Sequence, residues 1–253
     1  MIRFISLLMT FFMFSCYSVI SEFTEHEEIL DYAYYINQGW QAFEESVNLS
    51  DLSDTLSIAQ RSEYYNLAFI MFNVAIESIQ SEFLNQVSIG PYYQAYNGIG
   101  WSQLYYAGDF LDDNIKRDSL RNEAIASFEL AYNDLNESEF DGILYQDWCN
   151  MYAGLFYTNY YLGLEDTSYF NLSLEYSEAL LSIKPLYDFN HDELDYKNIH
   201  YLRGKIYLRQ QLYDQAYDEI KVIVEDCNPY IGNTDQIDIN LLFNCFDEFS
   251  NNN

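Results

Sequence analysis

The chain has 253 residues, which is room for one or two domains with a substantial hydrophobic core. Aromatic residues make up 19% of it and only 3 residues are Pro and 10 are Gly, so the composition excludes a disordered chain and argues against a loop-rich β-sandwich. With 40 acidic and 11 basic residues the net charge is −29, which excludes nucleic acid and anionic membrane surfaces as general partners because most of the surface would repel them.

Residues 1–15 form the first predicted segment, a signal peptide. Arg3 precedes an apolar run from Phe4 to Phe14, and this run is shorter than the roughly 20 residues that span a bilayer. The run ends at Ser15 and Cys16, and the stretch 13–16 resembles the lipobox of bacterial lipoproteins. The resemblance implies that Cys16 is acylated and anchors the protein to a membrane. Ordinary cleavage and secretion is the alternative.

Residues 16–27 are predicted to be an acidic leader, followed by a single domain of residues 28–249 and a disordered tail of residues 250–253. From residue 28 onward, apolar residues recur at helical spacing, and no Asn-Gly hairpin signal separates two alternating runs. The sequence therefore predicts an all-α domain.

A short pattern of three residues recurs four times in this domain. A central aromatic or large apolar residue follows a small or apolar residue by four positions and precedes another by three. Small residues beside a ring on one helix face let a neighbouring helix approach closely. The four copies are Ala68, Phe72 and Ala75; Ala124, Phe128 and Ala131; Leu172, Tyr176 and Ala179; and Ala216, Ile220 and Ile223. Each copy follows a segment rich in aromatic residues and glycine: Gly39, Trp40 and Phe43; Tyr96, Gly100 and Trp101; Tyr152, Leu155 and Gly163; and Gly204, Tyr207 and Tyr213.

Together these patterns resemble tetratricopeptide repeats. The resemblance covers residues 28–226 and implies a TPR-like helical-hairpin solenoid of about four repeats, with a concave face lined by the first helix of each repeat. The segment from Asp235 to Phe249 is predicted to be a C-terminal capping helix that covers the end of the stack. The polar stretches 48–54, 109–114 and 186–196 are predicted to be surface connectors.

Three cysteines follow Cys16, and their spacing matches no CxxC pair or zinc pattern. Cys149 lies in an apolar helical pattern, which indicates a buried free thiol. An exported compartment allows at most one bridge, and the sequence leaves open whether Cys227 and Cys245 form it.

The sequence offers no support for an enzyme or a bound cofactor. HExxH, GxSxG, P-loop and GxGxxG motifs are all missing, and His26, His191 and His200 lie far from any Cys or Glu at ligand spacing. Asp188-x-Asn190-x-Asp192 begins like a calcium loop. However, Glu193 stands where the sharp turn needs Gly, and Ile199 stands where a bidentate Glu belongs. We therefore expect a solvated acidic connector and no metal site.

The resemblance also implies which residues face the concave groove and bind a partner: Trp40, Phe43, Trp101, Tyr105, Tyr157, Tyr160, Tyr161, Tyr201, Lys205 and Arg209. Aromatic rings with polar tips make good contact surfaces, although the same rings could instead fill the space between helices. Arg203, Lys205 and Arg209 concentrate positive charge in a strongly acidic chain. An acidic group should face them, either from a neighbouring helix or as the carboxylate of a bound peptide.

From these features we expect a non-catalytic protein–protein interaction scaffold that binds a protein or peptide segment in its concave groove. The lipobox and repeat resemblances imply an exported outer membrane lipoprotein of the bacterial cell envelope, facing the periplasm or the cell surface, without nucleic acid or small-molecule cofactor as a partner. The alternative is a SusD-like carbohydrate-binding lipoprotein, because such proteins are also helical-repeat lipoproteins with aromatic platforms.

Overall fold

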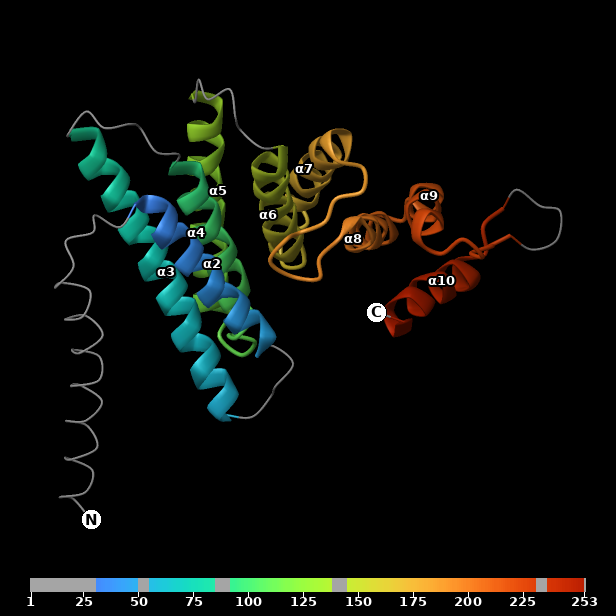
Figure 1. Ribbon diagram of the computed structural model, residues 1–253. Coiled ribbons are helices and arrows are strands. Elements are labelled where there is room, and N and C mark those ends of the chain that lie inside the picture. Colours follow the sequence, from blue (N-terminus) through green and yellow to red (C-terminus); the bar gives the residue numbers. More distant parts are fainter. Residues whose placement is uncertain (1–30, 50–54, 85–91, 138–144, 231–235, 253) are drawn as a thin grey trace, which may run out of the picture. The chain divides into compact units, whose positions relative to one another are not determined.

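Long helices account for most of the computed structural model, which describes residues 31–49, 55–84, 92–137, 145–230 and 236–252 (Figure 1). The predicted signal peptide, Cys16 and most of the acidic leader lie outside these residues. In the described part, the helices are α2 (Tyr32–Asn48), α3 (Thr55–Leu84), α4 (Tyr92–Ala107), α5 (Asn114–Glu137), α6 (Tyr145–Gly163), α7 (Tyr169–Ile183), α8 (Tyr196–Arg209), α9 (Tyr213–Ile223) and α10 (Ile239–Asn252). The described residues contain no strand beyond two isolated β-bridges. The predicted all-α class is confirmed.

The helices pack mainly as consecutive pairs within one compact unit, residues 32–253. The most extensive contacts are those of α2 with α3, α4 with α5, α6 with α7, and α8 with α9. The first helices of successive pairs also touch, because α4 contacts both α2 and α6. The predicted C-terminal helix corresponds to α10, which packs on α9 and extends to Asn252, past the expected domain end. No helix among the described residues is long and apolar enough to cross a bilayer.

Carboxylates at helix starts account for part of the acid excess. The Asp134 side chain accepts a hydrogen bond from the Tyr93 backbone N–H at 2.8 Å, beside the start of α4. Asp195 caps α8 by accepting from the Lys197 and Asn198 N–H groups. Asp113 at α5 and Asp238 at α10 do the same. These side chains satisfy backbone donors that have no partner inside the helix and place negative charge at the positive end of its dipole.

Two phenylalanine rings hold successive helix pairs together at glycines. Phe72 of α3 packs against Gly39 of α2 and Gly98 of α4, and a Cβ atom at Gly98 would lie 2.2 Å from the ring. Phe128 of α5 packs in the same way against Gly154 of α6, again at 2.2 Å. The small residues of the first two pattern copies are fully buried beside these rings: Ala68, Ala75, Ala124 and Ala131.

The third copy of the pattern differs from the prediction. Leu172 is 43% exposed, whereas α7 buries the residues one position further along, Ser173, Ser177 and Leu180, together with Phe170. The Ser173 hydroxyl donates to the Phe156 carbonyl at 3.0 Å, and that of Ser177 accepts from Arg203 at 2.7 Å. Hydrogen bonding removes most of the cost of burying a hydroxyl, so small serines occupy positions for which the pattern predicted apolar residues.

The cysteines settle the open question about a bridge. Cys227 and Cys245 form a disulfide that ties the segment after α9 to α10. Both belong to a small hydrophobic cluster of α8, α9 and α10 that is distinct from the larger core of the preceding helices. Cys149 is a buried free thiol, as predicted, and burial raises the pKa of its thiol to about 11.

Candidate functional site

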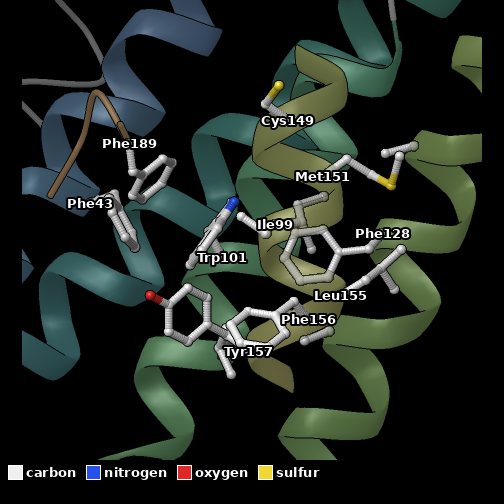
Figure 2. Close-up of a cluster of buried hydrophobic side chains, with 14 of the residues drawn as sticks. Phe43, Ile99, Trp101, Phe128, Cys149, Met151, Leu155, Phe156, Tyr157 and Phe189 are labelled. Carbon is white, nitrogen blue, oxygen red and sulfur yellow. The ribbon is translucent and has the colours of Figure 1, made fainter. Parts of the chain in front are cut away.

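The segment between α7 and α8, residues 184–195, covers part of the predicted binding surface. We call this segment the connector. The ring of Phe189 stacks on Trp101 with centroids 4.3 Å apart, and Figure 2 shows it beside both Trp101 and Phe43. The imidazole of His191 lies parallel to the Trp40 ring at 3.8 Å. The connector therefore occupies the aromatic faces of α2 and α4 that the sequence analysis assigned to a partner.

Polar contacts fix the connector in this place. It closes on itself through the Phe189 N–H, which donates to the Leu194 carbonyl at 2.8 Å. The Tyr105 hydroxyl of α4 donates to the Asp192 carboxylate. The Asn150 side chain of α6 donates to that of Asn190 at 3.1 Å. The connector is thus tied to the α4 and α6 helices and buries Tyr187 and Phe189, although Leu186, Asp188 and Asn190 are exposed, as predicted for a surface connector.

His191 ties the connector to α2 through a side chain that can titrate. Its Nδ1 lies 2.8 Å from the Glu44 carboxylate, and the ring is covered by Trp40 and edged by Phe189. Burial lowers the pKa of His191 despite the opposing effect of the Glu44 hydrogen bond. The imidazole is therefore neutral at neutral pH, when it stacks on Trp40 without carrying a charge into the core.

The predicted partner-binding residues separate into two groups. Around the connector, Phe43 and Trp101 are fully buried, Trp40 and Tyr105 are partly buried, and Tyr157 is 4% exposed. In the remaining group, Tyr160 is 7% exposed, Tyr161 is 37% exposed, Tyr201 and Lys205 are partly buried, and Arg209 is exposed. Tyr161 and Arg209 are thus the predicted residues that are most open to solvent in this structure.

The second group combines tyrosines with two cations. Lys205 lies over the Tyr201 ring at 5.7 Å, and Arg209 is close enough to Tyr160 to act on its titration. In the part of the chain that the structure describes, neither Lys205 nor Arg209 forms an ion pair. We call Tyr160, Tyr201, Lys205 and Arg209 the basic patch, whereas the Tyr161 ring lies against Arg121 of α5.

Arg203 differs from Lys205 and Arg209 of the same helix because a neighbouring helix supplies its acid. Its guanidinium lies 2.8 Å from the Glu219 carboxylate of α9, which also contacts His200 at 2.6 Å. Burial by itself would raise the pKa of Glu219, but the hydrogen bonds from His200 and Arg203 outweigh burial and lower it. Arg203 thus belongs to a structural ion pair between helices.

Sequence reasoning missed the role of the connector. Phe189 and Tyr187 are almost fully buried, and the Tyr187 hydroxyl donates to the Asn150 side chain at 3.2 Å. The available signal was the pair of aromatic residues on either side of Asp188, because a fully solvated acidic loop would expose both rings to water. The loop that starts like a calcium site uses Asn190 and Asp192 as hydrogen-bond partners. Among the described residues, no group of three or more His, Cys, Asp and Glu side chains could hold a metal.

Comparison of the chain with protein-family models, with curated proteins and with solved structures found no match. The geometry of the connector and of the basic patch is therefore what bears on the function.

Proposed function

We propose that this protein is a lipid-anchored interaction scaffold of the bacterial cell envelope, built from TPR-like repeats, that binds an acidic protein segment at the basic patch. The observation that carries the proposal is the pair Lys205 and Arg209, which has no acidic partner in the described residues although the chain has a net charge of −29. An acidic segment would find there two cations one helical turn apart, with tyrosine rings alongside.

Helix pairing supports the repeat assignment. Consecutive helices pair in the order that tetratricopeptide-like hairpins require, and the first helices of the first three pairs touch. Phe72 and Phe128 occupy equivalent places at glycines of successive pairs, which is the internal regularity expected of repeats.

The connector supports a role in holding extended segments. It is a non-helical stretch bound by rings of α2 and α4 and by side chains of α6. The first helices of the hairpins thus already hold one such segment, supplied by the chain itself. A partner would use the part of this face that the connector leaves uncovered, next to α8.

Two features support the proposed localisation in the cell envelope. Residues 1–16 resemble a lipoprotein signal that ends in Cys16. The Cys227–Cys245 disulfide fits an exported, oxidising compartment, since such bridges are rare in the cytosol. A carbohydrate-binding role has less support, because Trp40 and Trp101 stack against the connector and offer no free platform for a sugar.

The test is site-specific photo-crosslinking in the native envelope, with a photoreactive residue at Tyr201 and, as a control position, at Lys221 on α9. A protein adduct at Tyr201 should disappear when Lys205→Glu and Arg209→Glu are combined. The matched control, Lys116→Glu with Lys221→Glu, changes the charge equally at two other exposed lysines that lie over aromatic rings, and should leave the adduct unchanged. Equal adducts in both double variants would refute binding at the basic patch.

A further inference from the structure

A pocket lies beside the connector, between α4, α5 and α6. Its volume is about 370 Å³, within the range of cavities that hold small organic ligands. Leu194 of the connector forms part of its wall, together with Leu104 of α4 and Leu111 of the loop before α5. The aromatic residues Trp101, Tyr105, Tyr157 and Tyr161 form most of the remainder. This wall suits an apolar body.

One hydroxyl of the wall lacks a hydrogen bond. Tyr157 is 4% exposed, and its Oη has no hydrogen-bond partner among the described residues. A buried hydroxyl without a partner is unfavourable, and nearly all buried polar groups in folded proteins avoid that state. Burial raises the pKa of Tyr157 well above its ordinary value, so the hydroxyl keeps its proton and is available as a donor. A ligand acceptor in the pocket would satisfy it.

The single charged side chain of the pocket wall, as far as the described residues define it, is Arg121. It is 9% exposed, and its Nε has no hydrogen-bond partner in the same residues. Its two polar contacts are long, because one guanidinium nitrogen lies 3.5 Å from the Asp118 carboxylate and donates to the Tyr161 carbonyl at 3.4 Å. Arg117 lies one helical turn away, and burial together with this second cation lowers the pKa of Arg121. The guanidinium is therefore a buried cation with incomplete compensation.

We propose that this pocket binds a small monocarboxylic acid with an aryl or branched alkyl body. The carboxylate accepts hydrogen bonds from Arg121 and Tyr157, and the body packs among the leucines and rings of the wall. A carboxylate matches the planar fork of a guanidinium. A phosphate, with about two charges, would need more than the single cation that the wall provides. This site does not depend on the proposed partner binding at the basic patch.

The probes are phenylacetate, hydrocinnamate and isocaproate, each compared with its corresponding primary alcohol, which has the same body without the charge. Binding to the purified chain is followed by calorimetry and by methyl NMR of selectively labelled leucines. We expect at least one acid to bind about tenfold or more tightly than its alcohol. It should shift the methyl signals of Leu104, Leu111 and Leu194 and leave that of Leu67, which is outside this wall, unchanged.

Variants identify the two polar groups. Arg121→Gln should remove the preference for the acid over the alcohol. Tyr157→Phe deletes only a hydroxyl without a partner, so it should fold and melt like the parent while it weakens acid binding about fivefold. Arg209→Gln is the control, because this arginine is exposed and outside the pocket wall, and it should bind the acid like the parent.

Three outcomes would overturn the proposal: none of the acids binds more tightly than about 10 mM, acid and alcohol bind equally, or Tyr157→Phe binds the acid unchanged. Because Arg209 belongs to the basic patch and not to the pocket, loss of partner crosslinking in the Lys205 and Arg209 double variant with normal acid binding would separate the two sites.

Discussion

At the scale of single residues, the Phe128 ring occupies space that glycines leave free. Glycine is therefore expected to stabilise the helix at these positions, although it usually destabilises one. In an exposed helix, Gly→Ala stabilises by about 1 kcal/mol. At Gly154, a Cβ atom would lie 2.2 Å from the Phe128 ring. We therefore expect Gly154→Ala to lower the free energy of unfolding by about 1–3 kcal/mol, as measured by urea titration.

A double-mutant cycle separates this clash from other causes. Phe128→Leu removes the edge of the ring that the new methyl group would meet, so Gly154→Ala should cost clearly less in that background. Additive costs would mean that the ring does not set the requirement for glycine.

His191 gives the connector a dependence on pH. Its pKa is lowered by burial, so the folded state binds the proton less readily than the unfolded chain does. The stability that this residue contributes is present above the ordinary pKa of about 6.5 and is lost as pH falls through the lower value of the folded state. The groups that face it are Trp40, Phe189, the Glu44 carboxylate at Nδ1 and the Asn190 side chain at Nε2.

The test compares the parent protein with His191→Phe, which keeps a ring on Trp40 but does not titrate. From about pH 7.5 to about pH 5.5, the parent protein should lose more unfolding free energy than the variant. Groups far from position 191 are the same in both proteins and cancel in the difference. Parallel pH profiles would show that protonation of His191 does not lower the stability of the folded state.

At the scale of elements, the connector depends on one anchor. Phe189 is 2% exposed and stacks on Trp101, so Phe189→Ala should cost about 3–5 kcal/mol and shift the tryptophan emission to longer wavelength as Trp101 gains water. Leu186→Ala is the control on the same segment, because Leu186 is 68% exposed and should change stability by less than about 0.5 kcal/mol. Similar costs for both would contradict an anchored connector.

The sequence predicts the helices and their pairing better than it predicts the connector. Helical periodicity and the alanines around Phe72 and Phe128 depend on contacts within one helix or between chain neighbours, which a single sequence shows directly. The stacking of Phe189 on Trp101 joins residues 88 positions apart by number, and no local pattern encodes it. For the same reason, the sequence did not predict that the connector covers part of the groove. It also did not predict the pocket with Tyr157 and Arg121. In α7, hydrogen-bonded serines took positions that hydrophobicity alone could not assign.

At the scale of the whole molecule, the proposed anchor determines where the protein is found. Cys16→Ala should move the protein from the membrane fraction to the soluble fraction, because the apolar run before it is too short to span a bilayer. The control is Cys149→Ala, which removes a buried thiol within α6 and should not change the fractionation. Immunoblots of separated membrane and soluble fractions provide the measurement. A Cys16→Ala protein that stays with the membrane would contradict lipidation.

The clasp that His191 makes with Glu44 joins positions 147 residues apart, which is unusual in an array where most helices touch only their neighbours along the chain. Such arrays can lose their end units one by one, but here α2 is held by a segment that follows α7. Fraying of α2 therefore requires the clasp to open first, and we expect the hairpins before the connector to share one cooperative transition. During folding, the Trp40 ring lacks its His191 cover and Trp101 lacks its Phe189 cover until the connector docks.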